Sequence, residues 1–102
     1  MALVSGIYQI TRKLPKEELY GLTSQMRRAA VSIPSNLAEG AARTGQKEFA
    51  QFLSIAKGSL SELETQLLIS ADLGFLDRNH EIFQQTDKVS RLLAGLHRSL
   101  TT

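Results

Sequence analysis

Apolar residues recur every three or four positions along almost the whole chain, and this spacing constrains the fold more than any other feature of the sequence. A period of 3.6 residues places such side chains on one face of an α-helix, whereas a half-buried strand alternates every second residue. Runs of β-branched residues and Asn-Gly turns, which indicate hairpins, are absent. The pattern therefore predicts an all-α protein.

Three breaks divide this pattern into four helical segments. They lie at Pro15, at residues 43–45 and at residues 74–77. Because the connections are short, consecutive helices are expected to run antiparallel. We predict that residues 1–102 form a single domain, an antiparallel up-down-up-down four-helix bundle in which one apolar stripe of each helix faces the core.

Residues that favour helix ends stand at the breaks. The first helix is expected to stop before Pro15, because the residue preceding a proline avoids the helical region. Thr23, Thr44 and Asp77 are the predicted N-caps of the second, third and fourth helices. Gly74 is the predicted left-handed residue that ends the third helix.

Pro34 lies inside the second segment, and two interpretations are open. It either begins a new helix with Ile33 as its cap, or it kinks one continuous helix. The apolar spacing of Met26, Ile33 and Leu37 stays in phase across the proline. This favours one continuous helix with a kink.

If the second and third helices turn near residue 44, residues at the same level along the bundle have numbers that sum to about 89. This pairing predicts a close contact between Ala29–Ala30 and Gly58–Ser59, where small side chains would let the two helices approach. It also places Glu62 near Arg27, which favours a structural ion pair between these two side chains.

Glu62 and Glu64 are unlike a general acid-base pair. They stand two positions apart, so they point about 200° apart around the helix and cannot share one site. The same pairing of levels places Glu64 near Gln25.

The sequence lacks the patterns of known catalytic sites. There is no Cys, hence no disulfide or thiolate chemistry. His80 and His97 form no Glu-x-x-His motif of a bundle metal site, and no Gly-rich phosphate loop or Gly-x-Ser-x-Gly elbow occurs. We expect no enzyme activity, no metal and no cofactor.

The hydropathy of the chain argues against a membrane protein. No apolar run approaches the roughly 20 residues of a spanning helix. The N-terminus lacks the basic and apolar regions of a signal peptide. A cytoplasmic location and no membrane association are therefore expected.

Positive charge is concentrated in the first part of the chain. The net charge is +2, and residues 1–58 hold eight Lys and Arg against four Asp and Glu. A basic bias of this kind is compatible with a nucleic-acid partner but also with an ordinary solvated surface.

Six basic side chains are the candidates for contacts with RNA or DNA, and four of them would form a stripe along the second helix and just beyond the turn after it. No aromatic residues are interleaved with them, so phosphate contacts rather than base stacking are expected. The ion pair predicted between Glu62 and Arg27 would compete with phosphate for Arg27. The candidates are Arg12, Lys13, Arg27, Arg28, Arg43 and Lys47.

Three stretches carry a family resemblance: residues 19–40, with the sequence LYGLTSQMRRAAVSIPSNLAEG, residues 49–59, FAQFLSIAKGS, and residues 62–67, ELETQL. They resemble the signature of the four helix bundle protein family, also called the 23S rRNA intervening-sequence proteins. The resemblance extends from about Ile7 to Phe75. Members usually carry further residues upstream, so a short first helix is expected.

The resemblance implies a four-helix bundle that assembles as a ring-like homopentamer. Family members are encoded in intervening sequences of ribosomal RNA genes and at other loci. The chain also looks similar to the accessory variability determinant of diversity-generating retroelements, which works with a reverse transcriptase and has a basic surface for nucleic acid.

Two hypotheses follow for the function. The favoured one is a non-enzymatic homo-oligomer, implied to be a pentamer, that associates with RNA or DNA. The alternative is a protein adaptor or scaffold for a nucleic-acid enzyme such as a reverse transcriptase. It is motivated by apolar residues that lie off the core stripes, namely Phe75, Phe83 and Leu92.

Overall fold

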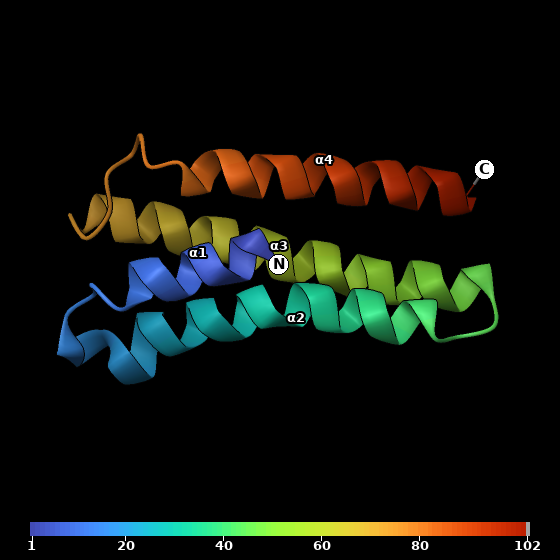
Figure 1. Ribbon diagram of the computed structural model, residues 1–102, viewed down its shortest axis with the longest axis horizontal. Helices are drawn as coiled ribbons and strands as arrows, with labels where there is room; N and C mark the ends of the chain where they lie inside the picture. The colour runs from blue at the N-terminus through green and yellow to red at the C-terminus, as the bar shows by residue number, and fades with distance from the viewer. Residues whose placement is uncertain (102) are drawn as a thin grey trace.

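A computed structural model describes residues 1–101 of the chain. The chain folds there into four α-helices: α1, Ala2–Thr11; α2, Ser24–Ala41; α3, Gln46–Asp72; and α4, Ile82–Thr101 (Figure 1). Consecutive helices run in opposite directions and lie side by side (Figure 1). The predicted all-α four-helix fold is confirmed.

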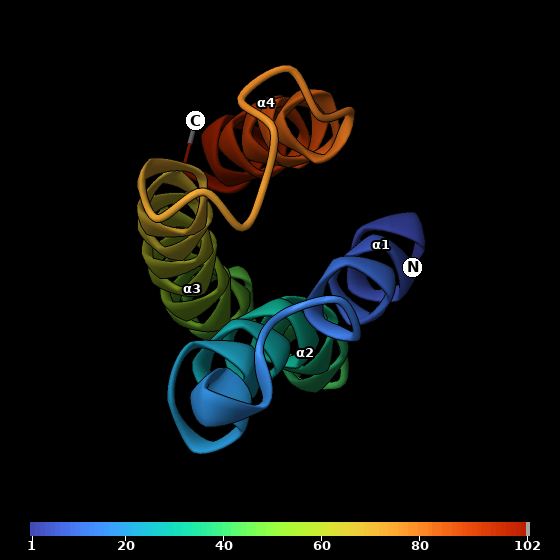
Figure 2. The same ribbon diagram turned by 90° about the vertical axis from the view of Figure 1, so that its left-hand side faces the viewer.

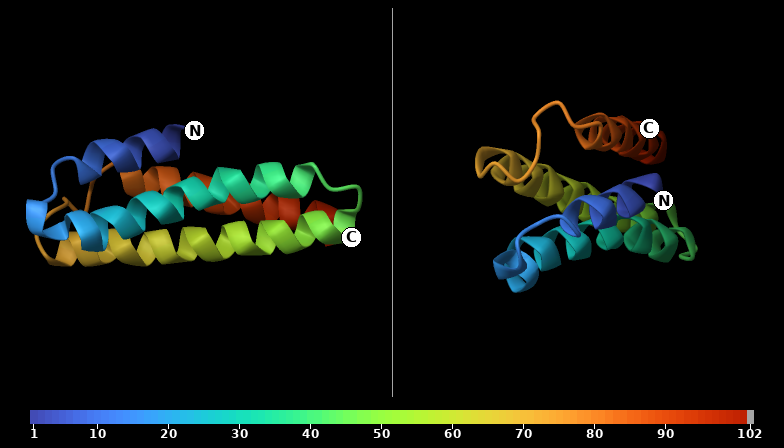
Figure 3. Two further views of the ribbon diagram at one scale, coloured as in Figure 1. Left: turned by 90° about the horizontal axis from the view of Figure 1, so that it is seen from below. Right: turned by 60° about the vertical axis from the view of Figure 1, so that its left-hand side comes forward.

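The four helices form an incomplete ring when the bundle is viewed along its length (Figure 2). The contact between α2 and α3 is the most extensive, and that between α1 and α4 is much smaller. With ten residues, α1 covers only one half of the bundle (Figure 3). At the other half α2, α3 and α4 pack without it, and Leu37, Leu96 and Leu100 remain partly exposed there.

Side chains from all four helices meet in one core. The spacing of three and four that defines the stripes in the sequence also defines the buried faces, as expected for helices that each turn one stripe inward. The largest fully buried apolar side chains are Ile7, Met26, Ile33, Leu53, Leu63, Leu67, Ile82 and Leu93.

Two of the predicted threonine caps are wrong. Thr23 has helical φ and ψ and no capping hydrogen bond, because a turn of π type, Leu19–Thr23, leads directly into α2. The N-cap of α3 is Gly45, whose backbone is extended, and Thr44 is exposed. Tertiary packing thus brings a preceding turn into line with α2 and removes the need for a side-chain cap.

The predicted cap of α4 is also wrong. The Asp77 carboxylate accepts a hydrogen bond from the backbone N–H of Asn79 at 2.7 Å and so closes a local turn. The helix begins later, where His80 Nδ1 accepts the N–H of Ile82 at 3.0 Å. The imidazole of His80 therefore has the capping role that was predicted for the carboxylate of Asp77.

Gly74 ends α3 as predicted. Its φ of 83° lies in the left-handed region, which a residue without a Cβ adopts at little cost. The Phe75 N–H donates to the Ser70 carbonyl at 2.9 Å, and the Gly74 N–H donates to the Ala71 carbonyl at 3.0 Å. This pair of bonds is a complete Schellman motif.

Pro34 lies inside α2, which continues on both sides of it. The prediction of one continuous helix is confirmed, and the alternative of a new helix beginning at Pro34 is wrong.

The first helix, α1, ends at Thr11, before the predicted limit next to Pro15, although Leu14 remains buried.

The predicted close approach at Gly58 is wrong. Gly58 is exposed, and a Cβ built there would meet nothing within 4 Å. The helices α2 and α3 approach at Gly40 instead, where a Cβ would lie 2.9 Å from Phe52 Cβ and 3.5 Å from Phe49 Cα. Pairing by level ignores the rotation of about 100° per residue, which turns Gly58 to solvent and Ser59 toward α2.

Candidate nucleic-acid interface

Arg27 joins α2 to α1. Its guanidinium lies over the Tyr8 ring, 4.6 Å from the ring centroid. Its Nε donates a hydrogen bond to Thr11 Oγ1 at 2.8 Å. The buried Thr11 hydroxyl in turn donates to the Ile7 carbonyl at 2.7 Å. The Nε–H and the flat face of the guanidinium are thus both engaged within the chain.

The predicted ion pair between Arg27 and Glu62 is therefore wrong. Glu62 Oε1 instead accepts a hydrogen bond from Gln66 Nε2 at 3.2 Å, within α3. Arg28, the next residue on α2, lines the same surface hollow as Glu62. The predicted level of Glu62 along α2 was therefore nearly correct. However, neighbouring residues of a helix point about 100° apart, so Arg28 and not Arg27 lies on the side of Glu62.

Glu64 does not lie against α2 as predicted but faces α4. Burial raises the pKa of its carboxyl group, and the nearby Asp87 carboxylate adds to the increase. Asp87 itself is paired with Arg91 on α4. Glu62 and Glu64 thus lie on different sides of α3, as their spacing predicts.

Arg28 is exposed between two shallow hollows on the surface. One hollow, of about 410 Å³, lies between α1 and α2 and is lined by Tyr8, Arg27, Arg28, Val31 and Ser32. The other, of about 230 Å³, lies between α2 and α3 and is lined by Gln25, Arg28, Ala29, Ser32, Ser59 and Glu62. Within residues 1–101, Arg28 belongs to no ion pair.

Hydroxyl and amide groups line the seam beside Arg28. The Ser32 and Ser59 hydroxyls are hydrogen-bonded at 2.8 Å across α2 and α3. Asn36 Nδ2 donates to the Ser32 carbonyl at 2.8 Å and to Ser32 Oγ at 2.9 Å. This network orders the surface next to the cation.

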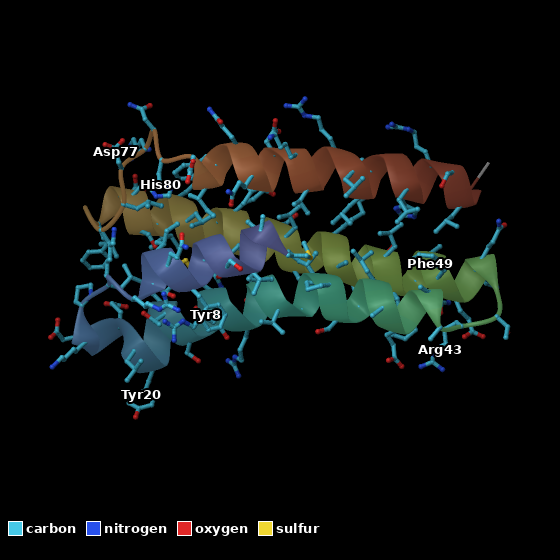
Figure 4. All side chains as sticks on the ribbon, in the orientation of Figure 1. Tyr8, Tyr20, Arg43, Phe49, Asp77 and His80 are labelled. Carbon is cyan, nitrogen blue, oxygen red and sulfur yellow. The ribbon has the colours of Figure 1, made fainter. Side chains whose placement is uncertain are left out.

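Arg12 and Lys13 lie at the C-terminal end of α1, near the start of α2. Both are exposed. Arg12 stands one helical turn after Tyr8, so the two side chains share a face of α1. The structure thus brings Arg12 and Lys13 to the same half of the bundle as Arg27 and Arg28, a half marked by Tyr8 in Figure 4.

Arg43 and Lys47 lie at the opposite end of the bundle (Figure 4). Arg43 is paired with Glu39 at 2.7 Å, and its guanidinium lies 5.1 Å from the centroid of the Phe52 ring. Lys47 is exposed in the first turn of α3. About 22 Å of helix axis separates Arg28 from Arg43, so the six basic residues lie in two groups at opposite ends of the bundle.

Aromatic rings do lie beside two of the arginines, contrary to expectation. Tyr8 is stacked with Arg27, and Phe52 with Arg43. Tyr8 and Arg27 come from α1 and α2, whereas Arg43 lies in the turn between α2 and α3 and Phe52 follows it on α3. The local pattern of residues does not indicate these contacts. The one available signal is that Tyr8 stands four residues before the basic Arg12, on the same face of α1.

Two of the three residues proposed as adaptor contacts are packed inside. Phe75 and Phe83 lie against the core, whereas Leu92 is 67% exposed. Four further large apolar side chains are exposed on α3 and at its C-cap, and the sequence pattern did not indicate them as a contact surface. They are Ile55, Leu68, Ile69 and Leu73.

Other classes of site were also considered. No three His, Asp or Glu side chains among residues 1–101 are grouped as metal ligands would be. None of the helices over that range is long and apolar enough to cross a membrane.

The chain matches the sequence pattern of a known protein family. Residues 1–95 match the sequence pattern of a family described as 23S rRNA-intervening sequence protein. The matched region contains α1, α2, α3 and all six candidate basic residues. No curated protein matches the chain.

Proposed function

The chain belongs to the 23S rRNA-intervening sequence protein family, and on this premise we propose that it is a non-enzymatic homo-oligomer that binds RNA or DNA through phosphate contacts. The observation that carries this proposal is the exposed Arg28, which lies between two hollows and has no ion-pair partner within residues 1–101.

The surroundings of Arg28 suit a phosphate group. A guanidinium presents several N–H donors in a planar fork that matches phosphate oxygens. The hydroxyls of Ser32 and Ser59 line the same hollow, and because one donates to the other, the second offers a further donor. Arg12 and Lys13 add exposed positive charge in the same half of the bundle.

Arg27 supports binding indirectly. Its contacts with Tyr8 and Thr11 hold α2 against α1 and so hold the neighbouring Arg28 in place. Arg43 and Lys47, at the other end, form a second basic group that an extended nucleic acid would reach only by crossing the length of the bundle.

The binding proposal is tested by titrating labelled RNA and DNA, single-stranded and duplex, with the protein at rising salt concentrations. Phosphate binding predicts an affinity that falls as the salt concentration rises. The plot of log K against log salt then has a negative slope, and Arg28→Gln is expected to make this slope less steep by about 0.7–0.9. Arg91→Gln removes the same charge from α4, where Arg91 is paired with Asp87, and serves as the control. Binding that is absent at low salt, or that shows no salt dependence, contradicts the proposal.

We also propose that the protein assembles with copies of itself, as a pentamer, through the outer face of α3. Ile55, Ile69 and Leu73 are exposed there, at spacings of 14 and 4 that keep them on one side of the helix. A small domain gains stability when such apolar side chains are covered by another subunit.

Light scattering coupled to gel filtration tests this assembly. We expect the wild type to give the mass of five chains and Ile69→Ser to give smaller species. Leu92→Ser is the control, because Leu92 lies on α4 and is more exposed (67%) than Ile69 (43%). A monomer mass for the wild type at micromolar concentration contradicts the proposal.

The exposed apolar side chains of α3 also support the alternative function of an adaptor for a nucleic-acid enzyme such as a reverse transcriptase. A pull-down from the native host distinguishes the two. Recovery of such an enzyme, lost in Ile69→Ser and kept in Leu92→Ser, favours the adaptor, whereas recovery of the protein alone favours self-assembly.

A further inference from the structure

Tyr20, on the turn before α2, is the most exposed of the large apolar side chains in residues 1–101. Its relative exposure is 93%, against 40–67% for the other exposed side chains of this kind. In Figure 4 the ring points away from the bundle. Both faces of the ring are therefore open to a ligand.

The turn that carries Tyr20 is anchored in the core. Leu19–Thr23 forms a turn of π type that runs directly into α2. Within this turn Leu22 and Thr23 are buried, at 8% and 3% exposure. An aromatic ring held out on an anchored backbone is preorganised for contact, because little backbone freedom is lost when a ligand covers it.

The chain that follows Tyr20 carries no negative charge. Residues 19–38, which form the π turn and most of α2, contain two Arg and no Asp or Glu. Their exposed and half-buried polar side chains are hydroxyl, amide and guanidinium groups, which bond to the phosphates and sugars of nucleic acids. These side chains are Ser24, Gln25, Arg27, Arg28, Ser32, Ser35 and Asn36.

Acidic residues border this surface and direct a polyanion along it. Glu17 and Glu18 come just before the π turn, so phosphates are disfavoured on that side of Tyr20. Glu62 lines the hollow between α2 and α3. The hollow between α1 and α2, which Arg28 also lines, has no acidic side chain in its lining. The favoured path therefore runs from Tyr20 along the α1 side of α2 to Arg28.

The length of this path suits a short stretch of single strand. Tyr20 and Arg28 are eight positions apart. At 1.5 Å per residue they are separated by about 12 Å along the helix axis. This is about three to four nucleotides at the 3.4 Å spacing of a stacked strand.

We propose that the Tyr20 ring is a stacking platform for one base of an unpaired RNA or DNA strand, whose phosphates follow α2 to Arg28. Every base has a flat π face, so stacking on a tyrosine holds an unpaired strand without selecting its sequence. The bases of a duplex are stacked on one another and do not reach the ring. This inference rests on the proposed function, which it deepens by naming an unpaired strand as the class of nucleic acid.

Substitution of Tyr20 tests the platform. Tyr20→Leu is expected to weaken binding of a labelled unpaired strand at least about fivefold, the lower end of the effect of losing one stacked base. It should leave the affinity for a duplex of the same sequence unchanged. Tyr20→Phe keeps the ring and should bind the strand like the wild type. Leu19→Ala, which shortens another exposed side chain of the same turn, is the control. Equal losses for strand and duplex, or no loss for either, would overturn the proposal.

Tyrosine fluorescence reports on the ring itself. The chain has two Tyr and no Trp, so in Tyr8→Phe the intrinsic emission comes from Tyr20 alone. An unpaired strand is expected to quench this emission, after correction for its own absorption, and a duplex is expected to leave it unchanged. Full emission from Tyr20 with the strand bound would contradict stacking.

The same measurements separate this proposal from the proposed function. Strand binding that depends on salt and on Arg28, but is equal in the wild type and Tyr20→Leu, overturns the platform alone. Strand binding that quenches Tyr20, but is independent of salt and unchanged in Arg28→Gln, overturns the phosphate contacts and leaves the platform. If Tyr20→Leu changes the mass of the assembly and not the strand affinity, the ring is a contact between subunits and the platform is overturned.

Discussion

The Arg27 guanidinium lies 4.6 Å from the centroid of the Tyr8 ring, and its Nε donates a hydrogen bond to Thr11 at 2.8 Å. Arg27, which lies in the stretch of residues 19–40 that resembles the family, therefore contacts α1 and not Glu62 on α3. The adjacent Arg28 has no such contact and is exposed. The two neighbouring arginines thus have different roles, one in stability and one in the proposed binding.

Substitution of these two arginines should separate the roles. Arg27→Lys loses the planar stacking on Tyr8 and the Nε–H donor to Thr11, and we expect it to destabilise the protein by about 1–2 kcal/mol. Arg28→Lys should change stability by less than about 0.5 kcal/mol. Urea unfolding of both variants measures this, and equal unfolding midpoints would contradict the assigned contacts.

Two glycines should respond in opposite ways to alanine. At Gly40 a Cβ would meet Phe52 Cβ at 2.9 Å, so Gly40→Ala is expected to destabilise by about 1 kcal/mol or more, overpacking outweighing the gain in helix propensity. At Gly58 a Cβ meets nothing within 4 Å, so Gly58→Ala should stabilise by about 0.5–1 kcal/mol. Thermal unfolding compares the pair, and a stabilising Gly40→Ala would be inconsistent with the close approach.

Glu64 should make stability depend on pH. Its pKa is raised above the ordinary 4.5 on folding, first by burial and then by Asp87, so the folded protein holds the proton more tightly than the unfolded chain. The charged carboxylate therefore destabilises the fold above this raised pKa, and the effect disappears as the pH falls below 4.5.

Glu64→Gln is accordingly expected to raise stability at neutral pH by a few tenths of a kcal/mol, because solvent screens a group that is only partly buried. The gain should vanish at pH 4 and below. Glu62→Gln, an exposed glutamate on the same helix, is the control. Unfolding free energies measured across this pH range decide the matter, and a Glu64→Gln gain that does not change with pH would refute it.

The His80 cap should also be visible in stability. His80→Ala leaves the Ile82 N–H without its acceptor and is expected to cost about 1 kcal/mol, whereas His80→Asn retains a side-chain acceptor and should cost less. Hydrogen exchange of the Ile82 amide measures this, and unchanged protection in His80→Ala would show that the cap contributes nothing.

The fold class followed from the sequence because its causes are local. Each apolar stripe is a property of one helix, so Ile7, Ile33, Leu63 and Leu93 could be assigned to the core without knowing their partners. Gly74 could be identified for the same reason, since its left-handed φ depends only on the absence of a Cβ.

The candidate site was predicted only in part. The basic residues were identified by type, but which of them are engaged depends on rotation about the helix axes and on partners distant in sequence. Tyr8 and Arg27 meet because α1 packs on α2. The pair of Glu39 and Arg43 is local by contrast, because these residues stand four positions apart. The hollows beside Arg28 could not be inferred, because each combines side chains of two or more elements.

By itself, the sequence of this protein determined four helices, their breaks and the residues that turn inward, because these depend on periodicity within each segment. Only the tertiary structure decided that Arg27 is held by Tyr8 and that the helices approach at Gly40. It also decided that the Tyr20 ring lies in solvent on the turn before α2. Such contacts depend on the relative rotation and offset of whole helices, which no single segment specifies.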